Sequence, residues 1–344
     1  MITGLVRDWR YLNHEMGPYH VESPARLEVI YRMIEEEPDL ANLVLIEPRE
    51  AKEDEIALIH YPSYIDRLKE TKGKPRVILD PDTSTCALSY ETALLAVGGV
   101  LEAARAIMEK RIDNAFALVR PPGHHAEASR AMGFCLFNNV AIAARWLRQQ
   151  YGLERILIID WDLHHGNGTQ HAFYREKEVL YFSTHQFPYY PGTGSWEEVG
   201  EGEGLGFTFN VPLSPGKGDA DFLFIFKEIL GPIVDIYQPQ FILVSAGFDI
   251  YSGDPLGGMM VTGVGFAALA GLLLEMARKI CDSRLLLVLE GGYSLEGLRS
   301  GVKEILFQLS GLKEPPEIEP VISALTKKEL EPAFKNLRQY WLKT

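Results

Sequence analysis

Two metal-binding residue types follow one apolar segment of this sequence. Asp162 and His164 are two positions apart and come directly after an apolar run that ends at Asp160. Alternate side chains of an extended chain point the same way, so both can reach one ligand. Asp249, at the end of another apolar run, can supply a third ligand and leave a position open for water, as in catalytic zinc sites. The alternative is that the aspartates cap helices and His164 packs in a loop.

A pair of histidines follows the stiff segment 121–123, which is Pro-Pro-Gly. His124 and His125 suit proton transfer near neutral pH. They are otherwise part of a polar loop or additional metal ligands. Asp160 can orient one of the two imidazoles by accepting its other N–H, and Asn167 can orient the other with a neutral amide. For Asp160 the alternative is a buried carboxylate with a structural role.

A tyrosine follows two glycines at the end of a further apolar run. Tyr293 comes directly after Gly291 and Gly292, and a phenol on such a flexible turn can donate a hydrogen bond to a developing oxyanion. The alternative is that this tyrosine only packs in the core.

Aromatic residues in two other segments are candidates for a substrate channel. Gly133 and Phe134 form one segment, and Phe187, Tyr189 and Tyr190 form the other. Aromatic side chains at this density are common in cores, so the channel depends on the presence of the metal site.

Short apolar runs alternate with segments of helical period along most of the chain, which predicts an α/β protein with a mostly parallel sheet and helices on both faces. Ligand sites in such folds lie beyond the carboxyl ends of the strands, where most of the residues named above stand. The N-terminal residues are also expected to form a strand. The expected strands are 115–119, 155–160, 179–183, 241–245 and 285–289. The expected helices are 24–36, 61–71, 89–109, 138–150, 220–237, 265–280 and 295–309.

Composition limits the class of protein. The chain has 344 residues and a net charge of −13, which repels phosphates and argues against a general nucleic-acid binder. Three widely spaced cysteines fit reduced thiols, so we expect a cytoplasmic protein without disulfides. The N-terminus does not resemble a signal peptide, and the longest apolar stretch is too short for a membrane span. We therefore expect a soluble protein of one domain.

Taken together, these residues resemble the histone deacetylase family, with its bacterial relatives the acetylpolyamine amidohydrolases and acetoin-utilisation proteins. The resemblance covers nearly the whole chain and implies the arginase–deacetylase fold, with a core of about residues 1–311 and a helical extension over 312–344. The segments that carry it occur in family order: HVESPARLEVI (20–30), RPPGHHAEASRAMGFCLFNNVAIAA (120–144), IDWDLHHGNGTQHAFY (159–174), PGTGSWEEVGEGEG (191–204), SAGFDIYSGDPLGG (245–258) and LEGGYS (289–294).

The resemblance also implies a mechanism of amide hydrolysis. A zinc ion bound by the Asp162, His164 and Asp249 set would polarise the amide carbonyl together with Tyr293. His125 would draw a proton from the attacking water and then protonate the leaving amine, while His124, braced by Asp160, gives electrostatic help. The family further suggests two structural potassium ions, one near Asp160, Asp162, His164, Ser183 and Thr184 and a second near Phe173 and Val179.

Single positions indicate the subgroup and the substrate. Some family members have Asp at the position of Asn167, so the Asn makes this chain resemble the class II deacetylases and their bacterial homologues. The presence of Tyr293 favours an active enzyme. Leu256 stands where polyamine-selective relatives carry an acidic residue, so we expect a preference for acyl-lysine. Asp82 resembles a rim aspartate that binds the peptide backbone, its alternative being a helix cap. The residues expected to bind substrate are Gly133, Phe134, Tyr190, Leu256, Asp82, Gly291 and Gly292.

Three alternatives stay open at this point. Arginase-like ureohydrolases share the fold but need further aspartates, where this chain has Gly166 and Tyr251. A non-catalytic acyl-lysine-binding protein is expected to have lost a catalytic residue, and none is missing. The substrate is an acetylated lysine of a protein or peptide, or else an acetylated polyamine or another small amide, with no nucleic-acid or membrane partner expected.

Overall fold

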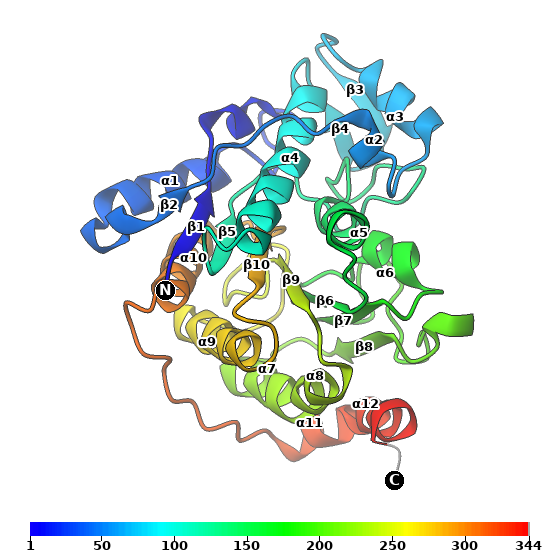
Figure 1. The fold of residues 1–344 in the computed structure, drawn as a ribbon, viewed down its shortest axis with the longest axis vertical. Helices are drawn as coiled ribbons and strands as arrows, with labels where there is room; N and C mark the ends of the chain where they lie inside the picture. The colour runs from blue at the N-terminus through cyan, green and yellow to red at the C-terminus, as the bar shows by residue number, and fades with distance from the viewer. Residues whose placement is uncertain (343–344) are drawn as a thin grey trace.

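The computed structural model describes residues 1–342 and has one central sheet of eight parallel strands (Figure 1). Their spatial order is β2-β1-β5-β10-β9-β6-β7-β8. A separate antiparallel pair, β3 and β4, lies away from this sheet. The strands of the central sheet are β1 (Thr3–Val6), β2 (Val44–Leu45), β5 (Asn114–Ala117), β6 (Ile156–Asp160), β7 (Val179–Gln186), β8 (Thr208–Leu213), β9 (Phe241–Ala246) and β10 (Leu285–Leu289); the pair is β3 (Val77–Asp80) and β4 (Thr83–Thr85).

The middle strands are buried along their whole length, as their composition predicts. β10 has the sequence LLLVL, and β6 is apolar up to its last residue, Asp160. A strand covered by helices on both faces has no polar side and therefore shows no alternation. The register aligns Asp160 with Ser183 of β7 and with Ser245 of β9, so the ends of these strands meet at one edge of the sheet.

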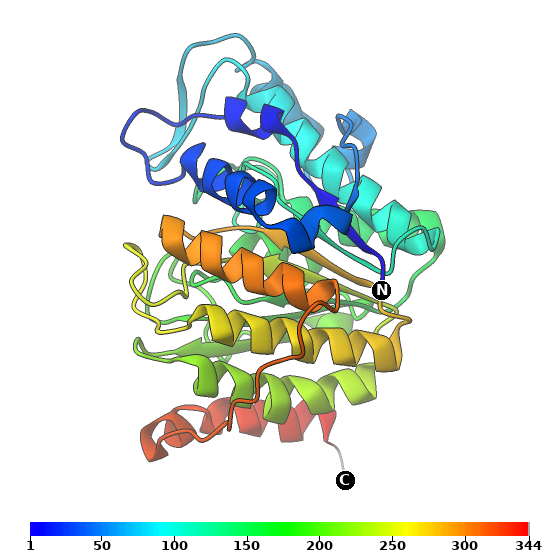
Figure 2. The ribbon, with the colours of Figure 1, turned by 90° about the vertical axis from the view of Figure 1, so that its left-hand side faces the viewer.

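Helices cover both faces of the sheet and confirm the expected α/β architecture (Figures 1 and 2). α1, α10, α9 and the pair α7–α8 lie on one face, whereas α4, α5 and α6 lie on the other. The bounds are α1 (Ala25–Glu36), α2 (Glu53–Ile56), α3 (Pro62–Lys69), α4 (Ser89–Met108), α5 (Asn139–Tyr151), α6 (Asn167–Phe173), α7 (Asp219–Ile225), α8 (Gly231–Tyr237), α9 (Gly263–Ile280), α10 (Leu295–Leu309), α11 (Ala324–Glu329) and α12 (Glu331–Asn336).

Two helices that start next to the strand ends have side-chain caps. The Asn138 side chain accepts a hydrogen bond from the N–H of Ala141 at the start of α5. Ser294 accepts one from the N–H of Gly297 at the start of α10, directly after Tyr293. Such caps stabilise the first turn of a helix by about 1 kcal/mol, and here they fix where the preceding loops end.

The C-terminal part of the described chain returns to the edge of the sheet. Residues 310–323 run without helix or strand across α9, where Pro315 contacts Gly271, and then lead to α11 and α12 (Figure 2). Trp341 packs on Phe207 at a ring distance of 5.4 Å. None of the described helices has the length and apolar content to cross a bilayer.

Several expected elements differ from the structure. The strand expected over 179–183 continues to Gln186, because β8 pairs with it as far as Gln186 and Leu213. The helix expected over 220–237 is one helical segment whose middle, Phe226–Leu230, has π geometry. The strand β8 and the short helix α6 were not among the predicted elements.

Candidate active site

The structure brings the predicted metal ligands together beyond β6 and β9. Asp162, His164 and Asp249 are all buried, and each offers a ligand atom within 4.8 Å of the others. His164 Nδ1 lies 3.2 Å from an oxygen of Asp162 and 3.0 Å from an oxygen of Asp249. The remaining carboxylate oxygens accept hydrogen bonds from the backbone N–H groups of Gly291 (2.8 Å) and Leu163 (2.9 Å), which fixes both carboxylates.

A glycine is required beside these carboxylates. A Cβ atom on Gly291 would lie 2.6 Å from an oxygen of Asp162 and closer still to an oxygen of Asp249. The backbone after β10 therefore approaches the ligand set more closely than any larger residue permits.

The chemistry of this donor set fits a divalent cation. Burial and the neighbouring charge of Asp162 raise the pKa of Asp249 to about 7, because two buried carboxylates repel one another. A cation between them would relieve this repulsion. Two carboxylates and one imidazole are ligand types that zinc accepts in catalytic sites.

The two adjacent histidines have different partners. His124 Nδ1 lies 3.0 Å from Asp160, and Tyr181 donates a second hydrogen bond of 3.0 Å to the same carboxylate oxygen. His125 Nδ1 lies 2.8 Å from the side-chain oxygen of Asn167. The structure thus pairs each histidine with one of the two partners expected from the sequence.

The surroundings of the two imidazoles shift their pKa values in opposite directions. Burial lowers the pKa of His124, but the charges of Asp162 and Asp160 outweigh burial and raise that pKa to about 10. Burial, together with the positive charge of His124, holds the pKa of His125 well below its usual range. These shifts favour the protonated form of His124 and the neutral form of His125.

A cavity of about 220 Å³ leads to this cluster. Burial raises the pKa of Tyr293 well above its usual value, so its phenol stays protonated and can donate a hydrogen bond. The residues that line the cavity are Asp82, Pro122, His124, His125, Gly133, Phe134, His164, Tyr189, Tyr190, Leu256, Gly291 and Tyr293.

Asp82 holds one wall of the cavity. Its carboxylate accepts hydrogen bonds from the Thr83 hydroxyl (2.7 Å) and from the N–H of Gly133 (3.2 Å). Neither donor belongs to the first turn of a helix, so Asp82 is not a helix cap. The Thr83 hydroxyl in turn accepts from the N–H of Phe134 (2.9 Å), which has a φ of +69°. These bonds stabilise an unusual backbone conformation that presents Phe134 to the cavity.

Two residues expected at the channel have other roles. Gly292 is not among the described residues that line the cavity, and its carbonyl accepts a 2.6 Å hydrogen bond from Arg26 Nε. Phe187 packs against His185, at a ring distance of 6.5 Å, and also lies outside the lining.

The residues expected to hold potassium fall into two groups in the structure. Ser183 and Thr184 lie on β7, which pairs with β6 at Asp160. The Thr184 hydroxyl is buried and has no hydrogen-bond partner in the described structure. Phe173 at the end of α6 and Val179 at the start of β7 flank the loop between these elements.

Comparison with known proteins agrees with this geometry. The sequence profile of the histone deacetylase domain matches residues 20–309. This chain belongs to the histone deacetylase family. Family membership also gives the reaction class, which is hydrolytic deacetylation.

Individual relatives are similar over most of this chain. A probable deacetylase of Archaeoglobus fulgidus is 42% identical over 99% of both chains. Histone deacetylase HDA1 of Candida albicans is 39% identical over 92% of this chain and 41% of its own length. Polyamine deacetylase HDAC10 of Homo sapiens is 37% identical over 93% of this chain and 50% of its own length. This chain therefore spans about half the length of these two eukaryotic relatives.

A solved histone deacetylase domain has the same fold. The crystal structure of the HDA15 HD domain superposes with a TM-score of 0.92 at 35% identity and covers 99% of this chain and 95% of that one. The arginase–deacetylase fold expected from the sequence is thus confirmed.

Sequence reasoning missed several charged residues that hold this deacetylase site together. Glu290, the residue after β10, accepts hydrogen bonds from the N–H groups of Gly123 (2.6 Å) and His124 (3.1 Å). Asp254 accepts from the N–H groups of Tyr293 (2.6 Å) and Ser294 (2.9 Å). Glu290 could have been found from the sequence, because its carboxylate follows an otherwise apolar strand and a buried carboxylate needs a partner.

Arg26 is a further missed residue. It lies on the buried side of α1 and donates to the carbonyls of Glu290 (2.5 Å) and Gly292 (2.6 Å), with its guanidinium 5.1 Å from the ring centre of Tyr293. A charged residue on the apolar side of an amphipathic helix was the signal that could have indicated it.

Proposed function

We propose that this protein uses one zinc ion to hydrolyse the amide of acetylated lysine side chains in proteins or peptides, releasing acetate and the free amine. The single observation that carries the proposal is the convergence of a three-ligand metal site, a neutral histidine and a tyrosine at the end of one narrow cavity. Such a cavity accepts an extended acyl-amine chain.

Each residue has a distinct part in the proposed reaction. Zinc, held by Asp162, His164 and Asp249, would supply Lewis acidity at the amide. Because its Nδ1–H donates to Asn167, His125 has a free Nε2 that accepts the proton of the attacking water and returns it to the leaving nitrogen. The Tyr293 hydroxyl donates to the carbonyl oxygen as that atom gains negative charge.

His124 contributes as a fixed positive charge. Its pairing with Asp160 keeps it protonated, so it favours the negative charge that develops nearby without losing its own proton. The same cation lowers the pKa of the adjacent His125 and so keeps that base neutral.

The finer cofactor and location assignments are also proposals. We place a structural potassium ion near Asp160, Asp162, His164, Ser183 and Thr184, supported by the unpartnered Thr184 hydroxyl, and a second near Phe173 and Val179. A cytoplasmic location is supported by the free thiols of Cys86, Cys135 and Cys281.

An acetylated polyamine is the second candidate substrate. One relative is named a polyamine deacetylase, and the net charge of −13 attracts polycations. Against it, the apolar side chain of Leu256 lines the cavity and offers a secondary ammonium group no charge.

One substrate screen tests the proposal. The purified protein, with its zinc content measured, would be compared on an acetyl-lysine peptide, N-acetylated polyamines and lysines with other acyl groups. We expect about one zinc per chain and the highest catalytic efficiency on the acetyl-lysine peptide. A protein that holds zinc but hydrolyses none of these amides, or that clearly favours the polyamine, would overturn it.

A further inference from the structure

Asn167 connects the catalytic base to a carboxylate that the proposed reaction does not use. Its Oδ1 lies 2.8 Å from His125 Nδ1, and its Nδ2 donates a 2.5 Å hydrogen bond to Oε1 of Glu127. The three side chains form one continuous series from the cavity toward the surface, where the side chain of Glu127 is 19% exposed.

The chemistry of these groups fixes the direction of every hydrogen bond. An ionised carboxylate can only accept, so the amide nitrogen of Asn167 must face Glu127 and its oxygen must face His125. An amide oxygen can also only accept, so His125 must carry its proton on Nδ1. The lone pair of His125 is then left on Nε2, the nitrogen that has to accept a proton from water. The amide nitrogen of Asn167 also donates to the carbonyl oxygen of His125 (3.3 Å), so the shorter bond to Glu127 reinforces an orientation that both acceptors favour.

Glu127 is itself held in place and ionised. Its carbonyl oxygen accepts a 2.9 Å hydrogen bond from Nδ1 of His60, and its N–H donates to the carbonyl of Arg130 (2.9 Å). His171, one helical turn after Asn167 on α6, lies 2.9 Å from Oε1 of Glu127. Burial raises the pKa of Glu127, but the interactions with His171 and Asn167 outweigh burial and place it below the ordinary value.

We propose that Glu127 is a positioning residue for His125, which acts through Asn167 to fix the base-competent tautomer and to supply the negative charge that Asn167 lacks. Glu127 does not line the cavity among the described residues, so it acts on the reaction only through this series. The inference rests on the proposed function, because it concerns His125 as the proton acceptor.

The chain contains a matched series that serves as a control. His165 Nε2 lies 3.0 Å from Oε1 of Gln170, and Nε2 of Gln170 donates a 2.6 Å hydrogen bond to Glu198. The order of imidazole, amide and carboxylate is the same, but His165 does not line the cavity among the described residues. Glu198→Gln therefore removes the carboxylate charge from an equivalent series, but the histidine of that series is not the proposed base His125.

The experiment measures kcat, KM, zinc content and thermal stability for Glu127→Gln and Glu198→Gln on the acetyl-lysine peptide. Glu127→Gln keeps the size and polarity of the side chain but loses its charge. We expect kcat to fall about tenfold, the lower end of what such supporting partners contribute, with KM and zinc unchanged. Glu198→Gln should leave kcat at the level of the unmodified protein.

Moving the carboxylate distinguishes a positioning role from a structural one. In Asn167→Asp, two carboxylates would meet where the present hydrogen bond is 2.5 Å long, so kcat should fall. In the double variant that combines Glu127→Gln with Asn167→Asp, the amide introduced at position 127 donates to the carboxylate introduced at position 167. That carboxylate accepts from His125, so most of the lost kcat should return. If Glu127→Gln does not fold, Asn167→Asp alone still tests the inference.

The outcomes separate this inference from the proposed function. If the unmodified protein hydrolyses no amide, the proposed function fails. If it is active but Glu127→Gln keeps its kcat, if the double variant is no better than Glu127→Gln, or if Asn167→Asp keeps its kcat, the positioning role is wrong.

Discussion

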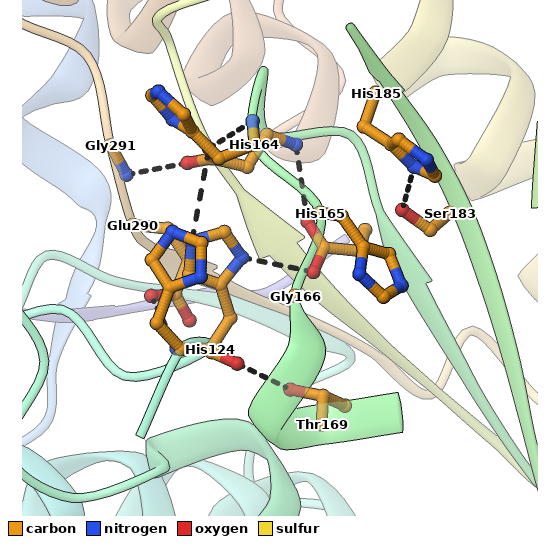
Figure 3. A network of polar contacts seen from close by, with 12 residues as sticks. His124, His164, His165, Gly166, Thr169, Ser183, His185, Glu290 and Gly291 are labelled. Atoms are coloured by element: carbon orange, nitrogen blue, oxygen red, sulfur yellow. Dashed lines mark hydrogen bonds and ion pairs between the residues drawn. The ribbon is translucent and has the colours of Figure 1, made fainter. Parts of the chain in front are cut away.

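The loop between β6 and α6 separates two groups of buried histidines with contrasting surroundings (Figure 3). On the cavity side, His124 and His164 contact the carboxylates of Asp160, Asp162 and Asp249. On the rear side, the rings of His165 and His185 are tilted against each other with their centres 4.8 Å apart. They bond only to neutral groups, which are the side chains of Thr193, Gln170 and Ser183 and the carbonyl of Gly194.

The difference shows that burial alone does not make a histidine catalytic. Burial lowers the pKa of His185 to about 4, so this ring is neutral and only contributes to packing and hydrogen bonding. On the cavity side, nearby carboxylates reverse that effect for His124. We therefore expect changes on the cavity side to affect turnover and changes on the rear side to affect stability.

The largest effect is expected from the metal ligands. Asp162→Ala or Asp249→Ala should remove measurable turnover and zinc retention together, because two remaining ligands hold zinc poorly. Metal analysis and a deacetylation assay on the same samples check this. Full zinc occupancy with normal turnover in either variant would refute the site, and Glu198→Gln is the matched control on the rear side.

The next largest effect is expected from Tyr293, which lies on the cavity side and acts on the reaction rather than on metal binding. Tyr293→Phe should leave the fold and zinc content intact and lower kcat about 10²–10³-fold, the usual loss for one oxyanion donor. KM should change much less, because the hydrogen bond forms mainly in the transition state. A kcat equal to that of the unmodified protein would mean that the phenol does not act on the oxyanion.

The sequence alone predicted the elements and ligands whose signals lie in a short stretch of chain. The strand over 285–289 and the helix over 295–309 have the predicted bounds, since an uninterrupted apolar run and a capped amphipathic segment are both local signals. The convergence of Asp162, His164 and Asp249 followed from the rule that parallel strands end at one edge.

Contacts between distant segments could not be predicted in this way. Glu290 bonds to the backbone of His124, 166 residues earlier, and no local pattern specifies that pairing. Glu127 is similar, because its bond to Asn167 depends on how α6 packs beside the loop after β5. The missing strand β8 has a further cause, since its sequence TFNVPL mixes apolar residues with Asn and Pro.

On the rear side, pH should change stability rather than catalysis. The folded-state pKa of His185, about 4, lies below the unfolded value of 6.5, so its contribution is fully present above pH 6.5 and is lost as the pH falls toward 4. A shift of this size corresponds to about 3 kcal/mol. Urea unfolding across this pH range should therefore show a shallower loss of stability for His185→Gln than for the unmodified protein. Parallel curves would contradict this.

The smallest effect, a change of substrate preference, is expected from one charge at the cavity lining. Leu256 is fixed by a 2.9 Å hydrogen bond from its N–H to Asp254, and its carbonyl accepts one of 3.0 Å from Tyr189, so a new side chain should keep this position. Leu256→Glu should raise catalytic efficiency on N-acetylated polyamines relative to the acetyl-lysine peptide by about tenfold, since a carboxylate near a secondary ammonium group gains about 1 kcal/mol in water and more where water is excluded. Leu256→Gln, with the same shape and no charge, is the control. Added salt should weaken the new preference, because it screens the attraction. If Leu256→Gln shifts the preference as much as Leu256→Glu, shape rather than charge selects the substrate at this position.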